Sequence, residues 1–548
     1  MKQMPQLPQI PESERTPAVD KLLDFIQLLV KEIQELRQEN QLLRQENQLL
    51  KNEIAVLKGQ KPKPSMLPNK LGKEPDGDGN MDDNNKKRPG SEKRKKTAEL
   101  VIHEEIHVAA ENVPQGSIRK GYNEFVVQTI KIETRNIRYL LERWQTPDGK
   151  YLVATLPKEL GSSHFGPELI RYILYLHYQD HVTRPLILEH LLELGVDISS
   201  GQIDAILTID KDQFHDEKDE ILEVGLRNSK EIGVDDTIAR HAGKNGFCTQ
   251  IGSEFFTWFK STDSKSRINF LQLLRGTATN YLISEDALKY MAQHDVSDTM
   301  MRRFKLELNR SFRDQNEWDN FLSSECNVGV QQRRTITEAA LLGSIIFHGV
   351  PKDLVIQSDD AGQFAILIHG LCWVHAERHF RKIVPIDDQM RVKIEEIRDS
   401  IWTYYKELKE YKDNPSDEIK ELLDQKFDQI FSQTTEYFII NRTLQSIKKN
   451  KAELLLVLKR PYVSLHNNGS EREIREYAKR RKISGGTRSD LGRQCRDTFT
   501  SLKKTCRKLG ISFWQYLLDR ITNRGEFPRL SDLIVQKSTS PPPRSVLC

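Results

Sequence analysis

Acidic side chains occur at three places in this sequence where they could bind a metal ion. Asp235 and Asp236 lie in EIGVDDT, Asp359 and Asp360 lie in KDLVIQSDDAGQF, and Glu471 lies in HNNGSEREIREYAKRRK. Carboxylate oxygens are ligands that Mg²⁺ and Mn²⁺ prefer, and these ions relieve the repulsion between clustered carboxylates. Two such ions about 4 Å apart can hold the attacking and leaving oxygens of a phosphoryl displacement. The chemistry that these residues indicate is therefore metal-dependent cleavage or transfer of a phosphodiester.

The segments that lead into the two Asp pairs are apolar and are typical of buried strands in an α/β sheet. We expect each strand to end at its Asp pair, because ligand sites on such sheets lie beyond the carboxyl ends of the strands. GFCTQIGS and EFFTWFKSTDS predict two further strands, and RINFLQLLRG predicts a helix that ends at Gly276. A second helix is expected from about Ala361. An Asp at a strand end can instead cap a helix, and for Asp360 we favour that role.

Glu471 opens a helix that is otherwise almost wholly basic. One interpretation is a solvated face on which Glu471 pairs with Arg475, four residues further along. The other is a metal-binding carboxylate beside cations that contact DNA phosphates. His466, Asn467 and Asn468 precede the helix and could cap it or orient a phosphate. The cations proposed for DNA are Arg472, Arg475, Lys479, Arg480, Arg481 and Lys482.

The composition limits the remaining possibilities. The chain has 548 residues, of which 30% are charged, and a formal net charge of only +4, so nucleic-acid affinity must come from local basic patches. Its six cysteines form no CxxC pair, which argues against a disulfide framework or a structural zinc site. There is no apolar run of 18 residues, signal peptide, P-loop, GxSxG or HExxH motif. We expect a cytoplasmic, nucleoid-associated protein without membrane contact.

Residues 17–58 carry a leucine-zipper pattern. Leucine recurs every seventh residue, and β-branched residues or Asn fill the a positions, which predicts a parallel two-stranded coiled coil. Glu32, Glu39, Glu46 and Glu53 occupy g positions and Arg37, Arg44 and Lys51 occupy e positions, so two chains could also pair through charge. The alternative is a lone amphipathic helix on a globular core. The residues assigned to dimerisation are Leu22, Leu29, Leu36, Asn40, Leu43, Asn47, Leu50 and Leu57.

Between the zipper and the first strand we expect three segments. Residues 59–98 are expected to form a flexible linker that includes a basic arm. This arm either binds phosphate groups or is a solvated run of charged residues. Residues 99–160 are expected to be β-rich, with a hairpin at Pro147-Asp148-Gly149. Residues 161–228 are expected to be helical, with a turn at Gly195 and a helix capped by Ser199 or Ser200. These two helices are either a helix-turn-helix that recognises DNA bases or a corner at which two helices simply pack together. The basic arm contains Lys93, Arg94, Lys95 and Lys96.

Four motifs, in order, resemble those of DDE transposases: VDDT, SDDAGQF, CWVHAERHF and NNGSEREIR. The closest similarity is to the bacterial insertion-sequence type numbered sixty-six. The resemblance implies an RNase H-like catalytic core in which Asp235, Asp359 and Glu471 are the catalytic residues and metal ligands. Only the motif comparison selects the first Asp of each pair. The expected cofactor is Mg²⁺, for which Mn²⁺ would substitute, with two ions in the site.

The resemblance also marks CWVHAERHF as a family signature. From the residues we expect Trp373 in the core, and His375 and Arg378 toward the site or the DNA phosphates. Two ligands, Cys372 and His375, are too few for zinc. Members of this type often carry paired cysteines before the catalytic domain, whereas this chain has no cysteine before Cys248.

The expected fold class is therefore a multidomain α/β protein. An N-terminal parallel coiled coil and a small β/helical DNA-binding region precede an RNase H-like core with a helical insertion. The core begins at 229–380, with an extra helical stretch at about 277–350 that has no assigned role. The helical insertion domain follows at 381–460, the Glu helix and C-terminal helices at 461–525, and a tail at 526–548.

The function that this organisation indicates is DNA transposition. The partners would be double-stranded DNA, as transposon ends and target, and a second copy of the chain in a homodimer or higher oligomer. The resemblance also implies that accessory proteins encoded by the same element are partners. Two alternatives stay open: a catalytically silent transposase derivative, and a zipper-dimerised DNA-binding regulator.

Overall fold

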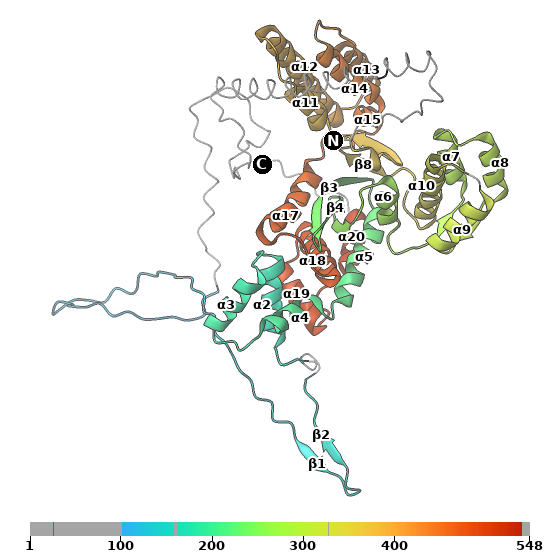
Figure 1. Ribbon diagram of the computed structural model, residues 1–548. Helices are drawn as coiled ribbons and strands as arrows, with labels where there is room; N and C mark the ends of the chain where they lie inside the picture. The colour runs from blue at the N-terminus through green and yellow to red at the C-terminus, as the bar shows by residue number, and fades with distance from the viewer. Residues whose placement is uncertain (1–25, 27–100, 158–159, 161–162, 327, 540–548) are drawn as a thin grey trace. The chain divides into compact units, whose positions relative to one another are not determined.

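The structure is a computed structural model that describes residues 26, 101–157, 160, 163–326 and 328–539 (Figure 1). The chain divides into two units, Met1–Phe125 and Val126–Cys548, and each is described by itself. In the predicted zipper only Ile26 is described, as a helical residue, and the basic arm lies outside the described residues. In the first unit, residues 101–125 are exposed and contain neither helix nor strand.

The predicted hairpin is present at the start of the second unit. Strand β1 (Arg143–Gln145) pairs antiparallel with β2 (Tyr151–Val153). These are the only strands in the described residues 101–157, so the expectation of a β-rich segment over 99–160 is wrong for most of its length. The side chains of Trp144 and Leu152 are both 63% exposed. The described residues of this segment are almost all exposed, so no core lies against them to stabilise a larger sheet.

Four helices precede the main sheet. Ser199 Oγ accepts a hydrogen bond from the backbone N–H of Gln202, and Gln202 Oε1 accepts one from the backbone N–H of Ser199, so the predicted cap is a complete capping box. Ile203 and Leu207 of the capped helix are buried. The helices are α2 (Pro167–Tyr178), α3 (Arg184–Glu193), α4 (Ser200–Thr208) and α5 (Asp212–Arg227).

The main sheet is mixed and has five strands in the order β5-β4-β3-β8-β9. The first three strands form an antiparallel meander, and β8 and β9 continue it in parallel with β3. This confirms the predicted α/β class. The strands are β3 (Glu231–His241), β4 (Lys244–Gly252), β5 (Thr257–Thr262), β8 (Val355–Ser358) and β9 (Ile368–Leu371).

Strand β3 does not end at its Asp pair, as we had expected. It continues to His241, because it still pairs with β4 down to His241 opposite Lys244. The turn between these strands places Ala242 and Gly243 in left-handed conformations, with φ of 46° and 79°. The parallel pairing with β8, in contrast, ends at Gly233 opposite Gln357. Asp235 therefore lies just beyond the parallel pairing, although it is mid-strand.

Helices cover both faces of the sheet. On one face, Ile474 and Tyr477 of α17 (Asn468–Ser484) pack on Cys248 and Phe259. On the other face, the inward side chains of β3 and β4 join the large core that includes α5, α6 and α10. Helix α6 (Arg267–Arg275) is capped by Ser266 and ends at Gly276, as predicted. The sheet is therefore buried on both sides, as its apolar strands require.

The outer edge of β5 is closed by α18 (Asp490–Leu509). The backbone N–H groups of Thr257, Phe259 and Ser261 each donate to a side chain of α18. The acceptors are Thr505 Oγ1, Ser501 Oγ and Asp497 Oδ2, at 3.1, 2.9 and 2.6 Å. Four residues on a helix and two on a strand advance by nearly the same distance, so three consecutive pairs stay in register. The small polar stripe of α18 thus replaces a sixth strand.

Two groups of helices are inserted in the sheet sequence (Figure 1). The stretch between β5 and β8 is largely helical, as predicted, and also holds the small pair β6 (Tyr281–Leu282) and β7 (Ser311–Phe312). Its helices after α6 are α7 (Glu285–Gln293), α8 (Asp298–Leu306), α9 (Gln315–Glu325) and α10 (Val330–Phe347).

The second group follows β9 and has a hydrophobic core of its own. Trp373 is 1% exposed in that core, which confirms its expected position. Its helices are α11 (Trp373–Arg381), α12 (Asp388–Asp413), α13 (Asp417–Phe431), α14 (Phe438–Lys449), α15 (Lys451–Leu454) and α16 (Leu456–Lys459). Helices α19 (Phe513–Thr522) and α20 (Leu530–Thr539) complete the chain after α18. None of the described helices is both long enough and apolar enough to cross a membrane.

Candidate active site

The three proposed catalytic carboxylates come from three elements of the second unit. Asp235 is on β3, Asp359 directly follows β8, and Glu471 is in the first turn of α17. Gly233 pairs with Gln357, and each of the two Asp residues lies two positions further along its strand. Because β3 and β8 are parallel neighbours, Asp235 and Asp359 lie at the same level of the sheet.

The start of α17 is bound to the same end of the sheet. Asn467 is its N-cap residue, but its side chain does not cap the helix. Instead, Asn467 Nδ2 donates to the carbonyl of Val234 at 2.8 Å, and its backbone N–H donates to Cys372 Sγ at 3.2 Å. Gly233 faces Ser470 so closely that a β-carbon would overlap the Ser470 hydroxyl. These contacts place the first turn of α17 directly over β3.

Electrostatics link the three carboxylates. The pKa of Asp235 is raised to about 7, chiefly by burial, with contributions from the negative charges of Asp359, Asp236 and Glu471. A hydrogen bond from the backbone N–H of Asp236 to Asp235 Oδ1, at 2.8 Å, acts in the opposite direction. A carboxyl that titrates near neutrality among other carboxylates is a recognised feature of catalytic and metal-binding sites.

Glu471 also lies among cations. Its carboxylate is 3.4 Å from His375 Nε2, 3.8 Å from Arg378 Nη2 and 3.6 Å from Arg475 Nη2. The ion pair with Arg475 is thus present, and His375 and Arg378 of α11 face the same side chain. Arg378 also lies 3.1 Å from His375 Nε2, and because an arginine only donates, that nitrogen is the acceptor. Burial and the charge of Arg378 lower the pKa of His375, which agrees with a neutral ring.

The donor set fits a divalent cation. Oε1 of Glu471 is buried and accepts no hydrogen bond, so a bound cation would satisfy it. Asp235, Asp359 and Glu471 supply the hard oxygen ligands that Mg²⁺ and Mn²⁺ require. Within the described part of the chain, however, no group of three or more His, Cys, Asp or Glu side chains is already arranged to hold a metal ion. The carboxylates influence one another without forming a closed cage.

The second member of each Asp pair has a different environment. Asp236 Oδ2 accepts a hydrogen bond from Gln363 Nε2 at 2.8 Å. Asp360 is exposed and pairs with His379 Nε2 at 2.9 Å. The expected capping role of Asp360 is wrong, because it is Asp359 Oδ1 that accepts from the backbone N–H of Ala361, at 3.1 Å. No long helix starts there either: Gly362–Phe364 forms a short 3₁₀ turn before the chain enters β9.

Two residues near the site were not found from the sequence. Gln363 belongs to the quoted SDDAGQF motif, so its position was visible but its partner Asp236 was not. Lys265 lies in the loop between β5 and α6, and its charge lowers the pKa of Asp236 against the effect of burial. No periodicity or motif marks this loop lysine, and only the tertiary structure brings it to the Asp pair.

The basic residues of α17 divide into two groups. The side chains of Arg472, Arg475, Lys479 and Lys482 are exposed. Arg480 is 5% exposed and bonds to the ring and the carbonyl of His177 on α2. Arg481 donates to Thr237 Oγ1 and to the carbonyl of Ile238 on β3. Arg480 and Arg481 are thus engaged with protein atoms of α2 and β3, whereas the first group lies on the exposed surface of α17.

The helix-turn-helix candidate α3–α4 has little positive charge. Helix α4 contains no Arg or Lys, and its exposed residues are Ser200, Gly201 and Gln202. Arg184 at the start of α3 is paired with Asp204 of α4. Because DNA affinity depends on cations near phosphates, this geometry favours the packing corner over base reading.

Comparison with known proteins adds the family. The sequence model of the Transposase IS66 family matches residues 331–495, which include Asp359 and Glu471 and begin after Asp235. The uncharacterized protein y4jO of Sinorhizobium fredii (strain NBRC 101917 / NGR234) is 41% identical over 309 residues. That similarity spans 56% of this chain and 96% of the relative. The family match defines the class, a transposase, and the fold is a mixed α/β sheet with inserted helices. The chain belongs to the IS66 transposase family.

Proposed function

We propose that this protein is a divalent-metal-dependent DNA transposase whose catalytic residues are Asp235, Asp359 and Glu471. The observation that carries the proposal is the placement of three carboxylates on β3, at the end of the parallel neighbour β8 and at the start of α17, which Asn467 binds to β3. These carboxylates are also coupled, since their charges contribute to the raised pKa of Asp235. Such coupling is unfavourable for a metal-free protein and is expected where a cation binds. We further propose that the five-stranded sheet is the RNase H-like core that the sequence resemblance implies.

The same three carboxylates would hold two Mg²⁺ ions, and Mn²⁺ would substitute. When bound, the ions supply charge stabilisation at the scissile phosphate and an activated water. The protein positions the reacting groups. Two carboxylates on adjacent strands and a third on a helix bound to β3 form a rigid frame, which is the main requirement in phosphoryl transfer. The charge of Arg378 lies 3.8 Å from Glu471, where it helps to fix the orientation of that carboxylate, and His375 accepts a hydrogen bond from Arg378.

The proposed reaction has two stages. Water attacks the phosphorus at the transposon end, and the P–O bond to the 3′-oxygen breaks, so that this oxygen takes up a proton and leaves as a 3′-hydroxyl. That hydroxyl loses its proton and attacks the phosphorus of a target phosphodiester, and the new P–O bond forms as the 3′-oxygen of the target leaves. Exposed cations of α17 (Arg472, Arg475, Lys479 and Lys482) would bind the DNA backbone beside the carboxylates. Phosphate contacts of this kind orient the duplex without reading its sequence. A second copy of the chain, joined through the zipper, would hold the second transposon end. Accessory proteins of the same element stay a proposal that rests on the family alone.

A plasmid excision assay with the cognate element tests this function. The variants are Asp235→Asn, Asp359→Asn and Glu471→Gln, and Asp360→Asn is the matched control, because it changes an adjacent but exposed carboxylate. We expect the first three to abolish excision while DNA binding is retained, and the control to stay active. If all variants excise like the wild type, the catalytic role is wrong. A zipper-dimerised DNA-binding regulator would then be the function to test, with residues 1–210.

A further inference from the structure

The link between β8 and β9 is unusually short for two parallel neighbouring strands. Strand β8 ends at Ser358 and β9 begins at Ile368, whereas parallel strands are usually joined by a crossover of a dozen or more residues. Leu367, just before β9, has a φ of 53°, a left-handed conformation that is unfavourable for a branched side chain. Such a backbone persists only where the surrounding contacts determine it. This tight link begins with Asp359.

Side chains from outside the link hold it in place. Arg267 Nη2, on α6, donates to the carbonyl of Gly362 at 2.6 Å. Phe364 is 2% exposed, and its ring meets Phe270 of α6 edge-on at 4.9 Å. The hydrogen bond from Gln363 to Asp236 attaches the same turn to β3. Helix α6 is therefore the main support of the turn that follows Asp359.

Arg267 is in turn held by a buried acid of the helical stretch 277–350. The side chain of Glu338, on α10, is 4% exposed and lies 3.6 Å from Arg267 Nη1. Glu338 also accepts hydrogen bonds from Tyr290 Oη of α7 and from Arg334 Nε, both at 2.9 Å. Arg267 Nη1 makes a further bond to Tyr290 Oη at 3.3 Å. A buried carboxylate with this many donors is a fixed anchor rather than a mobile surface charge.

We propose that Glu338 and Arg267 are positioning residues for Asp359. The role of the helical stretch 277–350, which the sequence did not assign, is then to stabilise the turn after Asp359. Residues of α7 and α10 hold Glu338 in place, and Glu338 orients Arg267. Arg267 in turn fixes the carbonyl of Gly362. The proposal rests on the proposed function, because it assigns these residues to the same reaction. Neither side chain touches DNA or the reacting atoms, so their effect is on the placement of the second carboxylate.

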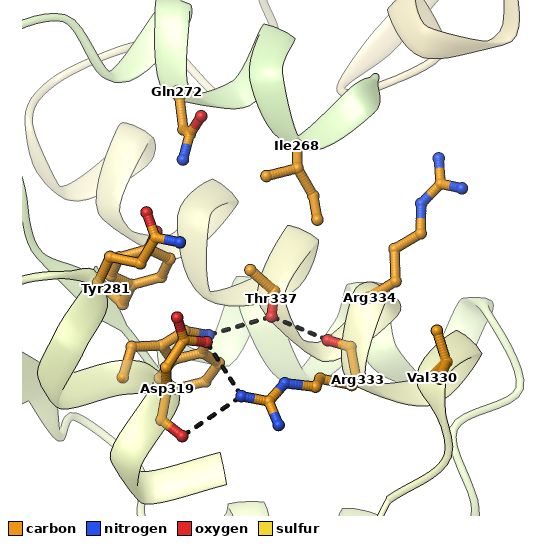
Figure 2. A pocket seen from close by; sticks show the side chains of 10 residues that line it. Ile268, Gln272, Tyr281, Asp319, Val330, Arg333, Arg334 and Thr337 are labelled. Carbon is orange, nitrogen blue, oxygen red and sulfur yellow. Dashed lines mark hydrogen bonds and ion pairs between the residues drawn. The ribbon is translucent and has the colours of Figure 1, made fainter. Parts of the chain in front are cut away.

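A pocket lined by residues of α6, α9 and α10, among them Ile268, Asp319 and Arg333, provides a matched control. Figure 2 shows that Arg333 of α10 reaches Asp319 of α9, with which it makes a hydrogen bond of 3.1 Å, whereas the adjacent Arg334 points away from that pair. Asp319→Asn removes a charged bond that α10 makes, as Glu338→Gln does. Among the described residues, the contacts of Asp319 are with Ser323 and Arg333 and do not lead to the turn after Asp359. A general loss of stability in the helical stretch would affect both variants, but a positioning role affects only Glu338.

The experiment measures cleavage by the purified full-length protein of a duplex carrying the transposon end, at saturating Mg²⁺. The variants are Glu338→Gln, Arg267→Ala, Arg267→Lys, Asp319→Asn and the inactive Asp359→Asn. We expect Glu338→Gln and Arg267→Ala to lower kcat about tenfold or more, because small displacements of catalytic groups have effects of this size. The Kd for the duplex should stay within about twofold of wild type, since phosphate contacts are unchanged. Arg267→Lys should recover part of the rate.

Further measurements separate placement from folding. The Mg²⁺ concentration for half-maximal rate should rise in Glu338→Gln and Arg267→Ala, and Asp319→Asn should match wild type in rate and in Mg²⁺ dependence. The positioning role is wrong if Glu338→Gln and Arg267→Ala cleave like wild type while Asp359→Asn is inactive. The proposed function would still stand in that case. The positioning role is equally wrong if Asp319→Asn loses rate as much as Glu338→Gln does. If wild type and Asp359→Asn cleave alike, the proposed function fails, and the positioning role fails with it.

Discussion

The carboxyl group of Asp235 is partly buried near three other acidic side chains, and its pKa is raised from an ordinary value of 3.8 to about 7. Between these two pH values the folded protein holds a proton that the unfolded chain has released. This group therefore favours folding at low pH, and its contribution is lost as the pH rises toward 7. In metal-free protein above pH 7, the ionised carboxylate destabilises the fold by an amount on the order of 4 kcal/mol.

Asp235→Asn should therefore stabilise the metal-free protein at pH 8, because asparagine occupies the same space and carries no charge. We expect its melting temperature in EDTA to exceed that of wild type at pH 8, with the difference shrinking toward pH 5. Added Mg²⁺ should raise the melting temperature of wild type more than that of the variant. Asp360→Asn, at an exposed position, is the control. Equal melting curves for wild type and Asp235→Asn at every pH would contradict the carboxylate cluster.

At the same scale, the sequence located the acidic residues but not their environments. In the sequence, only the motif comparison favoured Asp235 over Asp236. The parallel register of β3 and β8 gives a geometric reason, because it places Asp235 level with Asp359. The ion pair from Glu471 to Arg475 was predictable, because it depends only on helical spacing. The burial of Arg480 was not, since its partner His177 is far away in the sequence. Long-range partners are what a single sequence does not specify.

At the scale of elements, the contact between β3 and α17 determines where the third carboxylate lies. Gly233 lacks a side chain where the Ser470 hydroxyl approaches, and Asn467 Oδ1 would also lie 3.1 Å from a β-carbon there. Only glycine permits α17 to start so close to the strand. The position of Glu471 thus depends on a residue that contributes no chemistry.

Gly233→Ala should push the first turn of α17 away from β3 and lower the cleavage rate by about tenfold or more, with little change in DNA affinity. The double variant with Ser470→Ala removes the overlapping hydroxyl and should recover most of the rate. Gly469→Ala, in the same turn but facing open space, is the matched control and should stay active. Single-turnover cleavage is the measurement. If the double variant is no faster than Gly233→Ala, the close approach does not set the position of Glu471.

Elements were predicted well where their pattern is local and poorly where it is not. The helix from Arg267 to Arg275 and the capping box at Ser199 follow from caps, glycine and periodicity. The β-rich expectation for 99–160 failed because a segment forms a strand only where a sheet is present for it to pair with and pack against. The stripe of α18 that closes the β5 edge was missed, because Ser, Thr and Asp on a helix read as an ordinary polar face.

At the scale of the whole molecule, two sets of helices are inserted into one sheet, and each has a structural consequence for the site. The set after β9 has its own core, yet Trp373 begins α11, which also carries His375 and Arg378 to Glu471. The set before β8 leads through Glu338 and Arg267 to the turn after Asp359. The sequence spacing indicated both insertions. It did not indicate that both would reach the carboxylates, because that depends on side chains that meet only in the folded chain.

The zipper pattern of residues 17–58 carries the prediction for the assembly as a whole. Leu36→Lys with Leu43→Lys places two charges at d positions, where the partner helix should bury leucine, so the dimer should dissociate. Gln38→Lys with Gln45→Lys adds the same charges at outward f positions and should leave the dimer intact. Light scattering gives the mass of each protein, and excision measures activity. We expect the leucine variant to be monomeric and to bind a single DNA end but to lose excision, because two ends then have no common complex. A monomeric variant that still excises at the wild-type rate would show that each protomer acts alone, and the zipper would have to serve another purpose.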